Sequence, residues 1–339
     1  MAENVLASRV MLYYRKLRAT GNFSMEASFD CMIEHFPPDS MFHLHKYVLT
    51  HYSSGLLPRL QGMLEAWRER GDINHVTGDV HYIALALPGR RTALTIHDCV
   101  MMRHPNPVAR RILKWLWLDW PVRHCRYVTT VSNATREEVI RYTGCPPDKV
   151  VVIPTLIARH FDAATRPFNE ACPTILHVGL AHNKNFARHV AAIAGLDCRL
   201  HVIGKLEPQH LELLAQHHIQ YTSEFNLSME GMHRAYRNCD MVLFASTFEG
   251  FGMPIVEAQS VGRPVVTANI SSMPEVAGDG ACLVDPFSID DIRKGVLRII
   301  RERSYRETLV KRGFQNIRRF DPHVVAQQYE ELYRRIAAS

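Results

Sequence analysis

DMVLFASTFEGFGMPIVEAQSVG, residues 240–262, combines the patterns of a strand, a glycine-rich turn and a helix. The apolar run Met241 to Ala245 is short, continuous and bounded by polar residues, which is typical of a buried parallel strand. Gly250 and Gly252 then form a turn, and Pro254 suits the first position of a helix over 255–261, where no amide hydrogen is needed. This order predicts an open α/β sheet, which binds ligands at the carboxyl ends of its strands.

Two glutamates, Glu249 and Glu257, flank this turn eight residues apart. On one continuous helix their directions would differ by about 80°. Because the glycines and the proline interrupt the helix between them, both side chains can face one crevice, and the helix start offers free amide hydrogens to an anion. The alternative is a pair of surface glutamates beside an ordinary turn, which leaves the glycines unexplained.

The Glu249-x7-Glu257 spacing within EGFGMPIVEA resembles the donor-sugar signature of the retaining GT-B glycosyltransferases of family 4 (glycosyl transferases group 1), and in particular bacterial surface-polysaccharide enzymes. The resemblance implies two Rossmann-like α/β domains, with mostly parallel sheets facing a cleft. It also implies transfer of a sugar from a nucleotide-sugar donor to an acceptor hydroxyl, with retained anomeric configuration, in polysaccharide or glycolipid assembly. The resemblance is strong over 127–320 and diffuse before residue 73.

The resemblance assigns roles to the residues of the turn. Glu249, with the backbone of the turn, holds the hydroxyls of the donor sugar, and Glu257 accepts hydrogen bonds from the ribose. The implied donor-binding turn comprises Gly250, Phe251, Gly252, Met253 and Pro254.

Lys184 is the residue expected to neutralise the leaving diphosphate. The family usually has a basic residue after the glycine at 179 and an Arg-Lys pair before the next helix, but this chain has Leu180 and Asn183-Lys184 there. A helix dipole contributes ~0.3–2 kcal/mol, whereas an unpaired buried charge costs ~3–5 kcal/mol. The dipole alone therefore cannot hold a diphosphate, and we expect Lys184 to be essential. His182 is the nearest candidate helper, although an exposed loop histidine explains it more simply.

In the first half, His97 follows the predicted strand 92–96 and is the expected site residue there. The resemblance implies that it approaches the donor sugar. The alternative is a histidine whose ring is hydrogen-bonded to a neighbouring backbone group. Asp98 would orient that ring or cap the next helix. Gly21, in GNFSMEASF, resembles the family's first glycine-containing loop, while a turn before a capped helix explains it equally well.

The length of 339 residues suits two domains. We expect an acceptor-side domain over 1–165, a nucleotide-sugar-binding domain over 166–322, and a last helix over 323–339 that crosses back to the first domain. Eight cysteines, at least twenty residues apart, exclude a CxxC motif and suit buried thiols in a reducing compartment. The N-terminus does not resemble a signal peptide, so we expect a cytoplasmic protein.

The net charge of +6 is concentrated in the first half, where 20 Lys and Arg face 14 Asp and Glu in residues 1–160. Within it, Arg103–Arg126 has six cations and one acid, interleaved with Trp115, Trp117 and Trp120. This pattern favours a peripheral contact with anionic membrane, which would suit an acceptor glycan or lipid-linked sugar. The alternative is a core helix whose cations reach outward. Nucleic acid is disfavoured because no recognised module accompanies the patch.

Other cofactor and metal motifs are absent from the sequence. It contains no Asp-x-Asp, no GxxxxGK[ST] phosphate loop and no GxGxxG fingerprint. We therefore expect no metal and no cofactor, since the nucleotide-sugar is a substrate. Two rival functions remain open: a nucleotide-sugar epimerase of the same fold, and a catalytically silent glycosyltransferase-like partner. The presence of Glu249, Glu257 and Lys184 argues against the silent partner.

Overall fold

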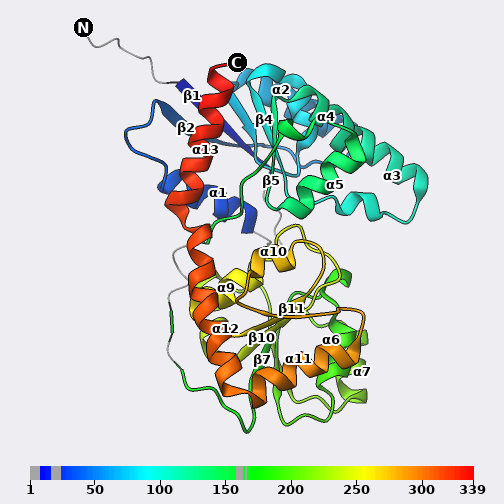
Figure 1. The fold of residues 1–339 in the computed structure, drawn as a ribbon. Helices are drawn as coiled ribbons and strands as arrows, with labels where there is room; N and C mark the ends of the chain where they lie inside the picture. The colour runs from blue at the N-terminus through cyan, green and yellow to red at the C-terminus, as the bar shows by residue number, and fades with distance from the viewer. Residues whose placement is uncertain (1–7, 17–23, 158–162, 165) are drawn as a thin grey trace. The chain divides into compact units, whose positions relative to one another are not determined.

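The computed structural model describes residues 8–16, 24–157, 163–164 and 166–339. The chain divides into two compact units, and each is described by itself. Unit 1 comprises Met1–Leu156 and Phe320–Ser339, and unit 2 comprises Ile157–Arg319 (Figure 1). The divisions therefore fall at 156/157 and 319/320, where the sequence predicts 165/166 and 322/323.

Unit 1 is built on a six-stranded sheet of order β2-β1-β3-β4-β5-β6 in which every pairing is parallel. Its strands are β1 (Ser8–Tyr14), β2 (Phe42–Val48), β3 (Ile73–Val76), β4 (Thr92–Ile96), β5 (Tyr127–Thr130) and β6 (Val150–Val152). In β1 every residue from Val10 onward is buried, and in β3 and β4 every residue is buried, as expected of central parallel strands.

The helical segments of unit 1 include one, α2, that begins earlier than the sequence predicts. They are α1 (Ser24–Glu34), α2 (Leu56–Arg68), η1 (His81–Ala86), η2 (Gly89–Arg91), η3 (Val100–Arg103), α3 (Pro107–Leu113), η4 (Lys114–Asp119), α4 (Trp120–His124), α5 (Asn133–Thr143), η5 (Pro147–Lys149) and α13 (Pro322–Ala337). The sequence predicts a helix only from Gly62, so its first six residues were missed. Ser132 caps α5 as expected, by accepting a hydrogen bond from the amide of Thr135.

The predicted helix over 107–124 is continuous but contains a π-helical segment, η4. Pro121 has no amide hydrogen to donate to the carbonyl of Trp117, four residues earlier. Buried His81 donates its Nδ1 hydrogen to that carbonyl instead, at 2.7 Å. The Trp117 carbonyl, which Pro121 leaves without its helical partner, is thus hydrogen-bonded by a side chain of η1. This hydrogen bond links η1 to η4.

The last helix, α13, is part of the core of unit 1. It contributes Val325, Ala326, Tyr329, Leu332, Tyr333 and Ile336 to a cluster with β1 residues. The Tyr333 hydroxyl lies 2.8 Å from Nδ1 of His75, a fully buried residue of β3. Burial lowers the pKa of His75 to about 3, so its ring stays neutral near pH 7.

Unit 2 has a second six-stranded sheet, of order β12-β11-β10-β7-β8-β9, again parallel throughout. Its strands are β7 (Thr174–Val178), β8 (Arg199–Ile203), β9 (Tyr221–Glu224), β10 (Met241–Phe244), β11 (Val265–Ala268) and β12 (Cys282–Val284). Its helical segments are η6 (His182–Lys184), α6 (Phe186–Ile193), α7 (Pro208–Gln216), α8 (Met229–Asn238), α9 (Met253–Val261), α10 (Met273–Ala277), α11 (Ile289–Arg301), α12 (Arg303–Asn316) and η7 (Ile317–Phe320), the last of which ends one residue beyond the division.

The α/β prediction with parallel sheets is confirmed in both units. Two strands were missed, β3 and β9. The first, INHV, carries two polar side chains inside the sheet, and the second, YTSE, is an exposed edge strand. Neither has the continuous apolar run that identifies a buried parallel strand.

Candidate functional site

The sheet order of unit 2 places the turn around residue 250 at a topological switch point. β7 lies between β8 and β10, so the segments that follow β7 and β10 leave the sheet in opposite directions. Open α/β sheets bind ligands at the carboxyl edge where such connections diverge. The loop after β7 carries Lys184, and the loop after β10 carries Glu249.

Lys184 and Glu249 form an ion pair at this edge. The Lys184 ammonium nitrogen lies 2.6 Å from Oε1 of Glu249, and the two side chains are only 20% and 13% exposed. The Asn183 amide donates to the same oxygen at 3.1 Å and to the carbonyl of Phe248 at 2.8 Å. Asn183 stands where the family pattern has an arginine, and here it orients Glu249. The pair was not predicted, because the two residues lie 65 positions apart in the sequence.

The turn that follows Glu249 is held by two serines that sequence reasoning did not select. The Ser271 and Ser272 hydroxyls lie 2.7 and 3.0 Å from the Glu249 carbonyl oxygen. Gly252 adopts φ +106° as the N-cap of α9, a conformation that glycine adopts without strain. The helix begins at Met253, immediately before Pro254, so the positive end of its dipole lies at this edge of the sheet.

Glu257 lies one helical turn inside α9 and accepts a hydrogen bond from the hydroxyl of buried Tyr236, with 2.6 Å between the oxygens. Burial raises the pKa of Glu257 to about 7, although the Tyr236 hydrogen bond and the charge of Lys184 act in the opposite direction. Tyr236 comes from α8 and was not predicted, because in the sequence it reads only as a buried position of a helix.

This pKa predicts that nucleotide affinity depends on pH. If Glu257 binds the ribose as a carboxylate, affinity should fall about tenfold between pH 8 and pH 6, as the carboxyl of the free protein becomes protonated. Titration calorimetry with a nucleoside diphosphate would measure this. The Glu257→Gln variant controls for titration of the phosphate itself, and it should bind about 10–100-fold more weakly with a flatter pH profile.

The same shift fixes the sign of the effect of Glu257 on stability. Its pKa in the folded protein lies above the ordinary value of 4.5, so its favourable contribution is present below that value and is lost as pH rises towards 7. Glu257→Gln should therefore unfold at pH 8 no more easily than the wild type.

The binding experiment can contradict the ribose assignment. It would do so if nucleotide binding had the same pH dependence in the wild type and in Glu257→Gln.

Leu180 and His182, at the other positions expected to assist the diphosphate, do not supply a buried cation. Leu180 packs on Gly204, where an added Cβ would lie 3.0 Å from its side chain. His182 is exposed, in agreement with its interpretation as a loop histidine. Of the groups expected to bind the diphosphate, Lys184 and the start of α9 are thus the positive ones at the carboxyl edge of this sheet.

Unit 1 has a cavity of about 460 Å³ at its own switch point, beside the carboxyl ends of β1, β3 and β4. Its lining comprises Arg15, Lys16, Met25, Tyr52, Ser53, Asp79, Val80, His81, His97, Asp98, Val100, Met101 and Trp117. Arg15 forms ion pairs with Glu26 and Asp79, and the Trp117 indole donates to the Asp79 carbonyl at 3.1 Å. Charged groups and aromatic rings thus face one space, which suits a polar, ring-shaped ligand.

His97 lines this cavity and is also hydrogen-bonded to the backbone. Its Nε2 donates to the Thr77 carbonyl at 2.7 Å, the contact that the simpler interpretation predicted. A Cβ on Gly78, which has φ +146°, would lie 2.6 Å from the His97 ring, so this glycine is required for the approach. Asp98 accepts from the amide of Val100 and therefore caps the following turn. Gly21 lies outside the described residues.

The cationic stretch Arg103–Arg126 is largely at the surface. Arg110, Arg111, Arg123 and Arg126 are exposed, but Lys114 is partly buried and lies 2.6 Å from Asp119. Arg103 lies 3.3 Å from Glu138. The indoles of Trp115 and Trp120 are exposed and stack with centroids 4.2 Å apart. Neutralisation by local acids reduces the charge that this stretch presents, while its apolar rings remain accessible.

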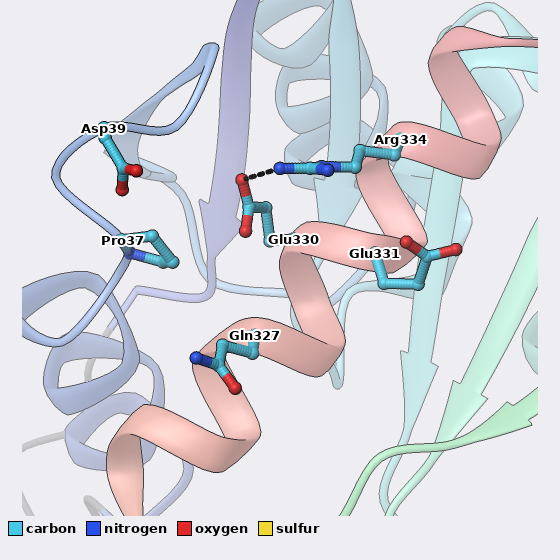
Figure 2. Close-up of a pocket in the computed structure, with 6 residues that line it drawn as sticks. All are labelled: Pro37, Asp39, Gln327, Glu330, Glu331 and Arg334. Carbon is cyan, nitrogen blue, oxygen red and sulfur yellow. Dashed lines mark hydrogen bonds and ion pairs between the residues drawn. The ribbon is translucent and has the colours of Figure 1, made fainter.

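Figure 2 shows a second cavity of unit 1, about 320 Å³, between the segment 37–39 and α13. Its lining comprises Pro37, Asp39, Gln327, Glu330, Glu331 and Arg334. Arg334 is bonded to Glu330 at 2.9 Å, which leaves the cavity net acidic. An acidic cavity repels a diphosphate, so it does not suit the donor. Among the described residues, Cys31 and Glu34 of α1 and His35, which follows this helix, group their ligand atoms within 4.8 Å, and this group includes none of the predicted site residues.

Comparison with known proteins identifies the family of the chain. The model of the family "Glycosyl transferases group 1" matches residues 159–316, and the model of "Glycosyltransferase Family 4" matches residues 34–159. Matched end to end, the two models cover 34–316, and the chain belongs to this group 1, family 4 glycosyltransferase family.

Two curated relatives carry more specific names. O-antigen chain mannosyltransferase B of Escherichia coli is 27% identical over 267 residues, covering 69% of this chain and 68% of the relative. The serotype-specific mannosyltransferase WbdA of Escherichia coli is 26% identical over 205 residues, covering 53% of this chain and 25% of the relative. The chain thus spans about a quarter of the length of WbdA.

The fold is shared with solved GT-B glycosyltransferases. The structure of Anabaena HepE in complex with UDP and glucose superposes with a TM-score of 0.75, covering 96% of this chain and 99% of that one, at 16% identity. At this identity the likeness concerns the fold alone.

Proposed function

We propose that this protein transfers a hexose, with mannose as the first candidate, from a nucleotide-sugar to a hydroxyl of a growing polysaccharide or glycolipid, with retention of configuration. The observation that supports it most is the constellation at the carboxyl edge of unit 2, where Lys184 contacts Glu249 beside Glu257 and the start of α9. The naming of the curated relatives as mannosyltransferases supports the choice of sugar.

The chemistry follows from where charge develops. The bond between the anomeric carbon and the diphosphate oxygen breaks, and negative charge accumulates on that oxygen. Lys184 and the amides of α9 neutralise this charge. Glu249 holds the sugar hydroxyls, and the acceptor hydroxyl attacks from the face that the diphosphate leaves and passes its proton to the leaving phosphate oxygen. His97, in unit 1, is the proposed residue that approaches the sugar from the acceptor side.

The proposal is tested by incubating the protein with GDP-mannose, then UDP-glucose, and an α-mannoside acceptor. An α-linked product, identified by NMR, is expected. A β-linked product would exclude retention. Conversion of the donor to an epimer without acceptor would instead support an epimerase, and absence of both transfer and donor hydrolysis would support a silent partner.

Metal independence is a separate prediction. Because Lys184 and a helix start occupy the position where a metal would neutralise the diphosphate, EDTA should leave the rate of transfer unchanged. Rates are compared before and after dialysis against EDTA. Loss of activity that Mg²⁺ or Mn²⁺ restores would reject this diphosphate site.

We further propose that the acceptor is lipid-linked and that the protein works as a peripheral protein on the inner face of a membrane. The exposed arginines and indoles of Arg103–Arg126 support this. Within the described ranges, no helix has both the length and the apolar character of a membrane span.

A further inference from the structure

The helix α2 (Leu56–Arg68) turns its large apolar side chains towards solvent. Leu56, Leu57, Leu60, Leu64 and Trp67 are 75%, 67%, 52%, 46% and 50% exposed. At 100° per residue these five positions fall within an arc of about 100° on the helix surface. We call them the α2 stripe. A surface helix of a globular protein normally buries such an arc against the core. In α2 the apolar arc faces solvent instead.

The buried face of α2 explains why the stripe cannot also be buried. The helix buries the small residues Gly62 and Ala66. A Cβ on Gly62 would lie 3.2 Å from the Tyr82 hydroxyl oxygen, and the Ala66 carbonyl accepts a hydrogen bond from Tyr13 at 3.0 Å. The close approach of the backbone to η1 and β1 fixes the rotation of the helix. The leucines therefore point outward because of how the opposite face of the helix packs, and not because of the conformation of any single side chain.

The helix α2 contacts the cationic stretch Arg103–Arg126 through Arg59, which lies beside the α2 stripe. Both α2 and η4 pack on η1. The Arg59 guanidinium of α2 lies 4.7 Å from the centroid of the Trp117 ring in η4. Near Trp117, α3, η4 and α4 expose Val108, Ile112, Trp115 and Trp120, and α3 also exposes Arg110 and Arg111. Neighbouring elements of unit 1 thus expose aliphatic, indole and guanidinium groups.

The cavity of unit 1 opens between these two apolar segments. Tyr52, four residues before α2, and Val100, at the start of η3, both line it and are 45% and 54% exposed. A ligand held at the surface beside α2 therefore lies close to the entrance of the cavity that His97 lines.

We propose that α2 lies in the surface of an anionic lipid bilayer, with the α2 stripe inserted among the acyl chains and the arginines of Arg103–Arg126 in the headgroups. The helix is about 20 Å long, so it suits an in-plane position and not a span. A second copy of the chain is the competing occupant. A symmetric dimer sets this surface against an identical one that is also cationic, whereas an anionic surface complements Arg110 and Arg111.

This inference rests on the proposed lipid-linked acceptor, but its test does not use activity. The full chain is sedimented with phosphatidylcholine vesicles that contain or lack phosphatidylglycerol. We expect binding to the anionic vesicles that weakens with salt. The variant Leu57→Gln, Leu60→Gln, Leu64→Gln should bind at least tenfold more weakly at every salt concentration, because the apolar contribution does not depend on screening.

Matched controls separate the two contributions. Leu211→Gln, at an exposed leucine of unit 2, should bind as the wild type does. Arg110→Glu with Arg111→Glu should remove the salt-dependent part. Because the stripe is exposed, the triple variant should keep its melting temperature and its transfer to a soluble acceptor, which tests the proposed function separately.

Two results would overturn the inference. One is a triple variant that sediments with anionic vesicles as the wild type does. The other is a wild-type dimer in light scattering that the triple variant loses, since the stripe would then be covered by a second copy.

Discussion

Replacing Glu249 by alanine should lower kcat by about 10²–10³-fold, the effect typical of removing one group that stabilises a transition state. Glu249 is expected to contact only the sugar, so the affinity for a nucleoside diphosphate should not fall. The ion pair sharpens this expectation. In the wild type Lys184 is engaged with Glu249 at 2.6 Å, and removal of the carboxylate frees its ammonium for the diphosphate.

The measurement combines steady-state kinetics with titration calorimetry. Nucleotide affinity in Glu249→Ala should be equal to or tighter than that of the wild type. Glu249→Gln keeps the size of the side chain and can still contact Asn183, so it controls for packing of the turn. Weaker nucleotide binding in Glu249→Ala with unchanged kcat would exclude the sugar-binding role.

The second large effect is expected at Lys184. Lys184→Ala removes the charge that we propose to neutralise the diphosphate, and it leaves the Glu249 carboxylate, 13% exposed, without its cation. Charged hydrogen bonds contribute about 1.5–3 kcal/mol, so nucleotide affinity should fall about 10–100-fold. Transfer should fall further, because negative charge on the diphosphate increases as the sugar leaves.

Two variants make this result specific. Lys184→Arg keeps the charge and should recover part of the affinity. Lys205→Ala removes a lysine that follows the neighbouring strand β8 but is 74% exposed, and it should bind nucleotide normally. If Lys184→Ala and Lys205→Ala lose the same small amount of affinity, the effect is general electrostatic attraction and Lys184 is not the diphosphate ligand.

The sequence alone predicted most of the elements of unit 2. The strands β7, β8 and β10 are marked by apolar runs, and the start of α9 is marked by Gly252 and Pro254. These are local patterns, which specify secondary structure without reference to distant segments. It also placed Lys184, Glu249 and Glu257 at strand or helix ends, because the carboxyl ends of parallel strands share one edge of a sheet.

What the sequence did not reveal depends on contacts between distant segments. Tyr236 reads as one more buried position of a helix, and only the packing of α8 against α9 brings its hydroxyl to Glu257 and buries that carboxyl enough to raise its pKa to about 7. The ion pair of Lys184 with Glu249, and the serines that hold the turn, likewise join loops separated in sequence by 22 to 65 residues.

The outward-facing apolar arc of α2 shows the same limit most clearly. In the sequence, its leucines have the spacing of a helix that buries them, since periodicity defines a face but not its direction. Contacts of Gly62 and Ala66 with Tyr82 and Tyr13 decide the rotation of the helix. The sequence by itself thus determined the parallel α/β units and the chemical groups of the proposed donor site. The tertiary structure decided which groups pair, which carboxyl is buried and which apolar face meets the surroundings, because each of these depends on what packs against the other side.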